Sequence, residues 1–221
     1  MSNPIPNCLK TGDILLFNGQ NYWFSSIVEW CTWSDYSHIG IVLKDPTYIS
    51  ENLKGYYLLE SGQERYPDAV EHKIRFGVQI VDLQKVIDLY DGRIFYRQLN
   101  LNTPIETKAQ LPLSSRIAKS LSQIWPKIKD DSYDYNPWDL LKVESHLNVG
   151  NNRRTDVFFC SALTTFIYHL AGLFKNSEIC WDLIEPRDYA PNSKIEKDYL
   201  LPNIELGGLV LIETSPADPK I

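Results

Sequence analysis

The sequence predicts an α+β fold built around a mostly antiparallel, curled sheet. Short runs of β-branched and aromatic residues, separated by Gly or Asp-Gly turns, crowd the first hundred residues. Apolar residues at helical spacing dominate the second half. Hydrophobic residues make up 43% of the chain and charged residues 23%, as in folded globular proteins. With 221 residues and no marked shift in composition, we expect a single domain over residues 1–221.

The first half supplies five predicted strands. Their short connections favour antiparallel neighbours, and the strands cover residues 12–18, 37–43, 56–60, 76–83 and 93–99. Between the first two strands, residues 21–33 place apolar side chains at helical spacing. This pattern predicts an amphipathic helix of about three turns.

The second half predicts two helices and one last strand. Residues 117–128 carry a helical stripe that Pro126 is expected to kink or end. Residues 160–171 give the clearest helix, with Gly172 as its stop. A short apolar run at 209–212 is typical of a strand.

Two segments are expected to add to this core. Residues 130–156 are polar, turn-rich and aromatic, which favours a long functional loop. The whole connection over residues 100–156 is interpreted as an insertion or active-site loop region. Residues 195–221 are interpreted as a C-terminal extension.

Charge and cysteine usage exclude several classes of function. The net charge is -6 and no basic run is present, so nucleic-acid binding is not expected. The N-terminus lacks a basic segment followed by an apolar run, and no stretch reaches 18 apolar residues. We therefore expect no signal peptide, no transmembrane segment and a cytoplasmic location. The four cysteines lack CxxC spacing and the histidines lack HxxxH spacing, so neither a metal nor a cofactor is expected.

Cys160 is the candidate nucleophile. It lies at or just before the first turn of the predicted helix 160–171. Unpaired N–H groups and the helix dipole favour an anion there, so a thiol at such a site carries more of the nucleophilic thiolate. The same amides can donate to a developing oxyanion. A lone cysteine before a helix is more often structural, so this interpretation depends on its partners.

His38 and Glu60 are the candidate partners. His38 begins the strand 37–43, where an imidazole can be held at a groove edge and exchange protons near neutral pH. Glu60 ends the strand 56–60. If the two strands pair, the carboxylate can hold the imidazole tautomer, as the third member of a Cys-His triad does. Taken singly, His38 is more simply a structural histidine, and Glu60 is more simply an exposed strand-end acid.

The other histidines compare poorly as bases. His169 lies nine residues after Cys160, about 13 Å along the helix axis and roughly half a revolution away. His72 lies in a polar turn and is expected on the surface. His146, in the predicted loop, is the remaining rival base.

Three further residues are candidates for substrate binding or oxyanion stabilisation. Tyr135 lies in the aromatic loop, Ser161 follows the nucleophile, and Tyr36 precedes the His38 strand. A tyrosine hydroxyl can assist an oxyanion, although loop aromatics more often hold the loop in place. Asp13, after Gly12, is expected to cap a turn or hold a neighbouring strand.

Four segments together resemble a known family. These are Leu9–Phe17, Tyr36–Leu43, Leu58–Gly62 and Phe159–Leu163, with the Gly-Asp, Ser-His-Ile-Gly and Cys-Ser pieces in that order. They are similar to the circularly permuted papain-like superfamily of NlpC type. Within it, they look most like the YaeF/YiiX-like permuted amidases, which have relatives in large DNA viruses. Residues 77–83 and 184–188 are also similar to family segments.

The resemblance implies a fold and a triad. The histidine strand comes before the cysteine helix, which packs across the curled sheet. Cys160 matches the nucleophile, His38 its base and Glu60 the acid that orients the base. Relatives often carry an acidic residue two positions after the nucleophile, where this chain has Ala162.

The function that follows is a cysteine hydrolase of amidase or peptidase type. It would cleave a peptide, isopeptide, N-acyl or lipid-ester bond through a Cys thioester. One alternative is a lipid acyltransferase or thioesterase on the same scaffold. An alternative of another class is a catalytically idle scaffold or virion structural and binding protein, with virion association expected if the chain is viral.

Overall fold

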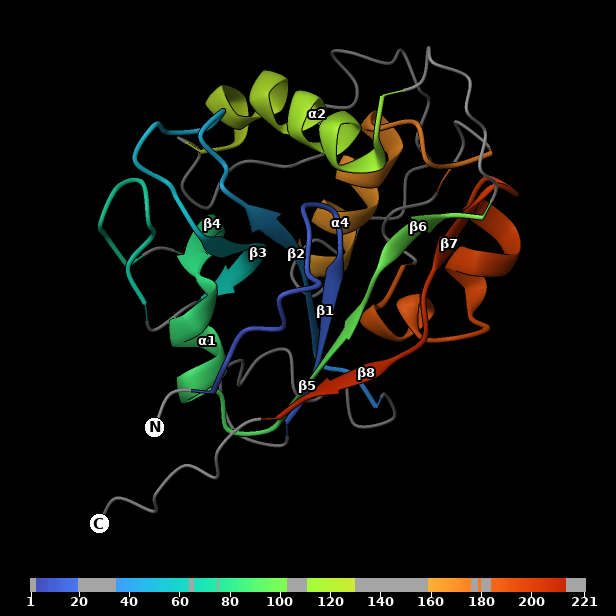
Figure 1. Cartoon of the computed structure of the whole chain (residues 1–221), viewed down its shortest axis with the longest axis horizontal. Helices are drawn as coiled ribbons and strands as arrows, with labels where there is room; N and C mark the ends of the chain where they lie inside the picture. Colours follow the sequence, from blue (N-terminus) through green and yellow to red (C-terminus); the bar gives the residue numbers. More distant parts are fainter. Residues whose placement is uncertain are drawn as a thin grey trace, which may run out of the picture.

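The computed structural model describes residues 3–19, 35–63, 66–74, 76–102, 111–129, 159–175, 179 and 184–213. Six antiparallel strands form the main sheet, in the order β4-β3-β2-β1-β5-β8 (Figure 1). They are β1 (Ile14–Asn18), β2 (His38–Lys44), β3 (Tyr56–Gln63), β4 (Phe76–Asp82), β5 (Arg93–Arg97) and β8 (Val210–Ile212). A second antiparallel pair joins β6 (Leu99–Leu101) to β7 (Ile204–Leu206). The predicted α+β class and antiparallel sheet are confirmed.

Two strand predictions need correction. The strand predicted over 76–83 ends at Asp82, because this side chain caps a helix that the sequence analysis missed, α1 (Leu83–Leu89). Its carboxylate accepts from the N–H of Gln84 at 2.9 Å and of Lys85 at 3.2 Å. The run predicted as one strand over 93–99 is two strands, because β5 pairs with β8 whereas β6 pairs with β7.

Both helices predicted in the second half are present. Helix α2 (Leu113–Ile128) does not end at Pro126 but continues past it. Helix α4 (Phe159–Leu170) stops as predicted, with Gly172 at φ +65° and its N–H bonded to the His169 carbonyl at 2.8 Å. The helix predicted at 21–33 and the loop predicted at 130–156 lie outside the described residues.

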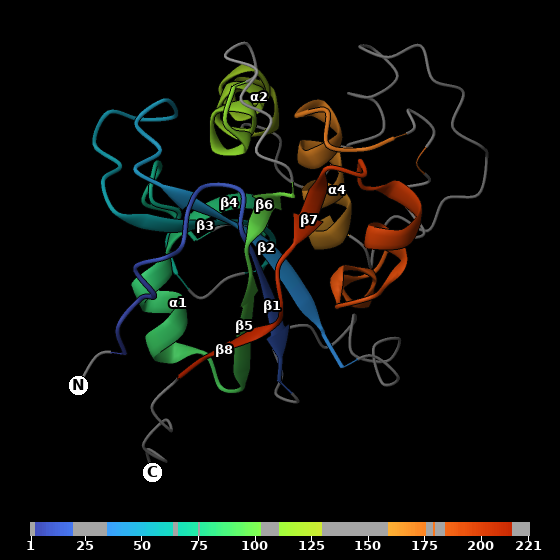
Figure 2. The same ribbon diagram turned by 45° about the vertical axis from the view of Figure 1, so that its right-hand side comes forward.

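Both faces of the sheet are covered by apolar side chains. Helices α2 and α4 lie on one side of the sheet and α1 on the other (Figure 2). Ile39 and Ile41 of β2 belong to the cluster under α2 and α4, whereas Val42 belongs to the cluster under α1. Successive side chains of a strand point to opposite faces, so the uninterrupted apolar run of β2 marks a strand that is buried on both faces.

The chain after α4 returns to the sheet. A short 3-10 turn, η2 (Pro186–Tyr189), and a single π-helical turn, η3 (Ile195–Tyr199), lead into β7 and β8. The described part of the predicted extension, residues 195–213, thus supplies an edge strand of the main sheet. Buried Arg97 on β5 bonds to the carbonyls of Tyr189, Leu206 and Gly207 and holds this segment in place.

Candidate active site

A buried His–Glu pair lies on neighbouring strands. His38 opens β2, and Glu60 lies on β3, which pairs antiparallel with β2. The Nε2 atom of His38 lies 2.7 Å from the Glu60 Oε2 atom, and the two residues are only 7% and 1% exposed. The sequence prediction that these residues meet is confirmed. A carboxylate at this atom favours the tautomer with its proton on Nε2, which leaves Nδ1 as the proton acceptor.

Glu60 is not the strand-end acid that the sequence suggested. Strand β3 continues to Gln63, so Glu60 lies inside the strand and opposite Gln79 of β4. The Gln79 amide donates from Nε2 to Glu60 Oε1 at 3.2 Å. The result is a line of hydrogen bonds across three adjacent strands, from β2 through β3 to β4.

Cys160 lies in the first turn of α4, as predicted, and is a buried free thiol. It belongs to the apolar cluster between the sheet and helices α2 and α4, together with Tyr36 and Ile39. The first turn of a helix carries N–H groups that no intrahelical acceptor uses, and such groups favour an anion nearby.

The last turns of α4 are anchored near the end of β2. Near the helix end, the Tyr168 hydroxyl donates to the Gly12 carbonyl at 2.6 Å, and the Gly12 N–H donates to the Val42 carbonyl at 3.0 Å. Helix α4 packs on β2 and β3. From this anchor, eight helical residues lead back about 12 Å to Cys160. Four strand residues lead back about 13 Å to His38.

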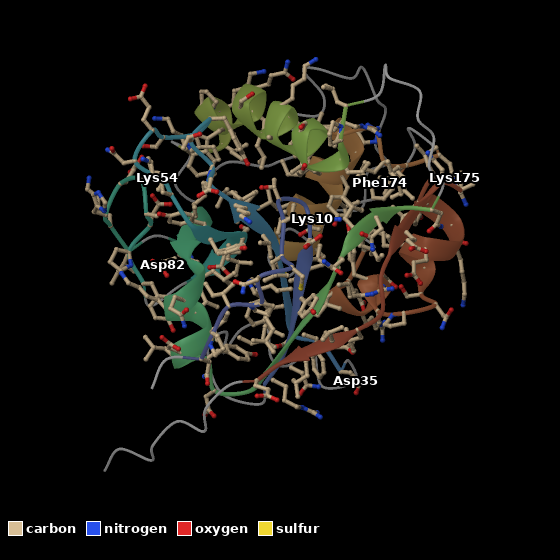
Figure 3. All side chains as sticks on the ribbon, in the orientation of Figure 1. Lys10, Asp35, Lys54, Asp82, Phe174 and Lys175 are labelled. Atoms are coloured by element: carbon tan, nitrogen blue, oxygen red, sulfur yellow. The ribbon has the colours of Figure 1, made fainter. Side chains whose placement is uncertain are left out.

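Figure 3 labels one residue next to each of these two elements. In Figure 3, Asp35, just before β2, lies at the bottom of the folded part, and Phe174, just after α4, lies in its upper half, below α2. Among the described residues, no hydrogen bond links Cys160 to His38.

His38 and Cys160 lie on opposite faces of β2. Ile39 faces α4, whereas the His38 ring packs on Phe17, with ring centroids 5.3 Å apart, in the cluster under α1. His38 is the first residue of its strand. A contact between imidazole and sulfur would therefore form around the beginning of β2.

The three candidate substrate residues have different surroundings. The Ser161 hydroxyl donates to the Ile184 carbonyl at 2.6 Å, so it binds α4 to the following segment. Tyr36 is buried edge-to-face against Phe95, with ring centroids 6.0 Å apart, and burial raises the pKa of its hydroxyl. Tyr135 lies outside the described residues.

Of the three remaining histidines, two lie among the described residues. His72 is exposed in a turn, as predicted. His169 lies in the last turn of α4, the end opposite Cys160. His146 lies outside the described residues.

Asp13 has the structural role predicted for it. Its carboxylate accepts from the N–H of Lys10 and of Leu99, both at 2.9 Å, and so ties the start of β1 to β6. Burial raises the pKa of Asp13 from 3.8 to about 6, although these two hydrogen bonds oppose the shift.

Gln79 is the residue that sequence reasoning missed. The available signal was a glutamine inside an otherwise apolar strand, Gly77-Val-Gln-Ile-Val81. A lone polar residue in such a run indicates a buried hydrogen-bonding partner. Its partner could be identified only from the register, which sets Gln79 opposite Glu60.

Two further properties bear on the class of site. Within the described ranges, no three His, Cys, Asp or Glu side chains gather closely enough to hold a metal ion. Among the helices that are described, none has the length and apolar character needed to cross a membrane.

Comparisons with known proteins assign no family. A scan against protein-family models gives no match. A search of curated proteins gives none either. What the site does is therefore judged from its geometry.

Proposed function

We propose that the chain is a cysteine hydrolase of amidase or peptidase type, with Cys160 as nucleophile, His38 as base and Glu60 as the residue that orients it. The observation that carries this proposal is the buried His38–Glu60 contact of 2.7 Å. Cys160 lies in the first turn of α4, which packs on β2 and β3. Permuted papain-like enzymes, which the sequence resembles, combine these three residue types in this chain order.

The reaction proceeds through a thioester. Nδ1 of His38 takes the thiol proton, and the Cys160 sulfur attacks the carbonyl carbon of an amide or ester. N–H groups in the first turn of α4 stabilise the oxyanion. The imidazolium returns the proton to the leaving amine or alcohol as its bond to the acyl carbon breaks. Water, deprotonated by His38, then cleaves the thioester and restores the thiol.

Selective alkylation tests the proposal. An unactivated thiol, with a pKa of about 8.5, is about 1% thiolate at pH 6.5. Cys160 is 9% exposed, whereas Cys8 is an exposed free cysteine of the same chain. Burial alone would make Cys160 the slower of the two. We expect iodoacetamide at pH 6.5 to modify Cys160 faster than Cys8, as measured by peptide mass spectrometry.

Variants identify the cause of that reactivity. His38→Ala should lower the Cys160 alkylation rate at least tenfold and leave Cys8 unchanged, because the imidazole that accepts the thiol proton is lost. If Cys160 reacts no faster than Cys8 in the wild type, the protein is a binding scaffold that keeps the residues without the chemistry.

Product analysis separates hydrolysis from acyl transfer. A thioester formed on Cys160 from an activated acyl ester is released as the free acid by water, or as an amide or new ester by an added acceptor. We expect the free acid to predominate in the presence of a primary amine or a lysolipid. Predominant transfer to either acceptor would replace the hydrolase by the acyltransferase alternative.

A further inference from the structure

The Gln79 side chain lies in an energetically unfavourable environment. It is fully buried on β4, and its Nε2 donates to Glu60 Oε1 at 3.2 Å. Its own Oε1 is buried without a hydrogen-bond partner. A buried polar atom without a partner is unfavourable, and most such atoms in folded proteins are satisfied.

The orientation of the amide follows from Glu60. Rotating the amide by 180° would turn Oε1 toward the carboxylate and bring two acceptors together. The observed orientation instead gives Glu60 a donor and leaves Oε1 without one. The carboxylate thus dictates how Gln79 is held, at the expense of Gln79's own acceptor.

We infer that Gln79 is a positioning residue that fixes the Glu60 carboxylate and, through it, the His38 tautomer that leaves Nδ1 to accept the thiol proton. The inference deepens the proposed function and rests on it for its catalytic meaning. A hydrogen bond from Gln79 stabilises the ionised, acceptor-only form of Glu60. That form keeps the shared proton on His38 Nε2, 2.7 Å away.

The direct test is the side-chain ¹⁵N NMR spectrum of His38 at a pH where the ring is neutral, with His38→Ala to assign the signal. Wild-type protein should show the proton on Nε2. Gln79→Met, which keeps the volume but not the donor, should shift the two ring nitrogens toward a mixture of tautomers. An unchanged His38 spectrum in folded Gln79→Met overturns the inference.

A double-mutant cycle separates positioning from a general structural effect. Loss of one net hydrogen bond predicts that Gln79→Met lowers the Cys160 alkylation rate about three- to tenfold. In a Glu60→Gln background the same change should have almost no further effect, because Gln79 acts only through the carboxylate. Equal effects of Gln79→Met in both backgrounds overturn the inference.

Two controls keep the test decisive. Ser61→Ala removes a neighbouring buried hydroxyl that also lacks a partner, so it should leave the His38 spectrum unchanged. If Gln79→Met does not fold, Gln79→Lys serves in its place. It keeps a donor at this position, so His38 should show the same Nε2 tautomer as in the wild type. A spectrum that responds to Gln79→Met while Cys160 alkylation never depends on His38 supports the positioning role and refutes the proposed function.

Discussion

Arg97 holds the C-terminal segment against the sheet, and its removal should cost a large part of the stability of the fold. The side chain is 2% exposed and donates to the carbonyls of Tyr189, Leu206 and Gly207, each at 2.7 Å. It also pairs with Glu196. Hydrogen bonds from a charged donor contribute about 1.5–3 kcal/mol each, so the three carbonyls alone account for about 4–9 kcal/mol.

Arg97→Met should therefore lower the free energy of unfolding by at least about 4 kcal/mol, when whole domains have about 5–15 kcal/mol. The variant also leaves Glu196 without the partner it has in the structure. Urea unfolding followed by circular dichroism measures the loss. Limited proteolysis should then cut within 186–213 before it cuts the other strands of the sheet, because β8 is an edge strand.

Two variants serve as controls for Arg97→Met. Arg97→Lys keeps the charge, but a single ammonium cannot reproduce the planar fork that reaches three carbonyls, so most of the loss should remain. Arg93→Met, on the same strand but exposed, should change stability by no more than about 0.5 kcal/mol. A loss below about 2 kcal/mol for Arg97→Met would refute the assignment of these contacts as the anchor.

Two further predictions concern buried groups of the sheet. Because the folded state raises the pKa of Asp13 from 3.8 to about 6, its stabilising contribution is present below pH 4 and is lost as the pH rises to 6. The change is up to about 3 kcal/mol; urea unfolding from pH 4 to 7 should show it in the wild type relative to Asp13→Asn, and a constant difference would contradict it. Gly40→Ala should destabilise by about 1–3 kcal/mol, since overpacking strains a core. Its Cβ would lie 2.7 Å from Leu58 Cδ1 and 3.0 Å from the Leu59 carbonyl; an unchanged thermal midpoint would exclude this clash.

The sheet was predictable because most of its strands can be recognised from their own local sequence. Runs such as His38–Lys44 combine β-branched residues with turns on both sides, and neighbouring strands with short connections pair in sequence order. The pairing of β8 was not predictable, since more than a hundred residues separate it from β5. Helix α1 was missed because its only strong local signal is the cap at Asp82, which directly follows a strand.

The candidate site was predictable in part. Hairpin pairing of β2 with β3 is local, so the meeting of His38 and Glu60 could be expected from the sequence. The placement of Cys160 depends on how α4 packs, and one anchor of that packing, the bond from Tyr168 to Gly12, spans 156 residues. No local pattern encodes such a contact.

Stability alone does not account for the polar line across β2, β3 and β4. His38, Glu60 and Gln79 are all buried in a sheet whose other inward positions on these strands are filled by residues such as Val42, Leu58 and Val81.

Replacing a buried ionic or polar network with apolar residues of similar volume is often neutral or stabilising. Here the network also leaves the Gln79 Oε1 atom without a partner, which well-packed leucines would avoid. Local choices that work against stability concentrate at functional sites. A triple variant, His38→Leu, Glu60→Leu and Gln79→Leu, should accordingly remain folded and unfold at no lower urea concentration than the single variant His38→Leu, which leaves the other two polar groups buried. If the triple variant is the less stable of the two, the line is a structural network and needs no chemistry to explain it.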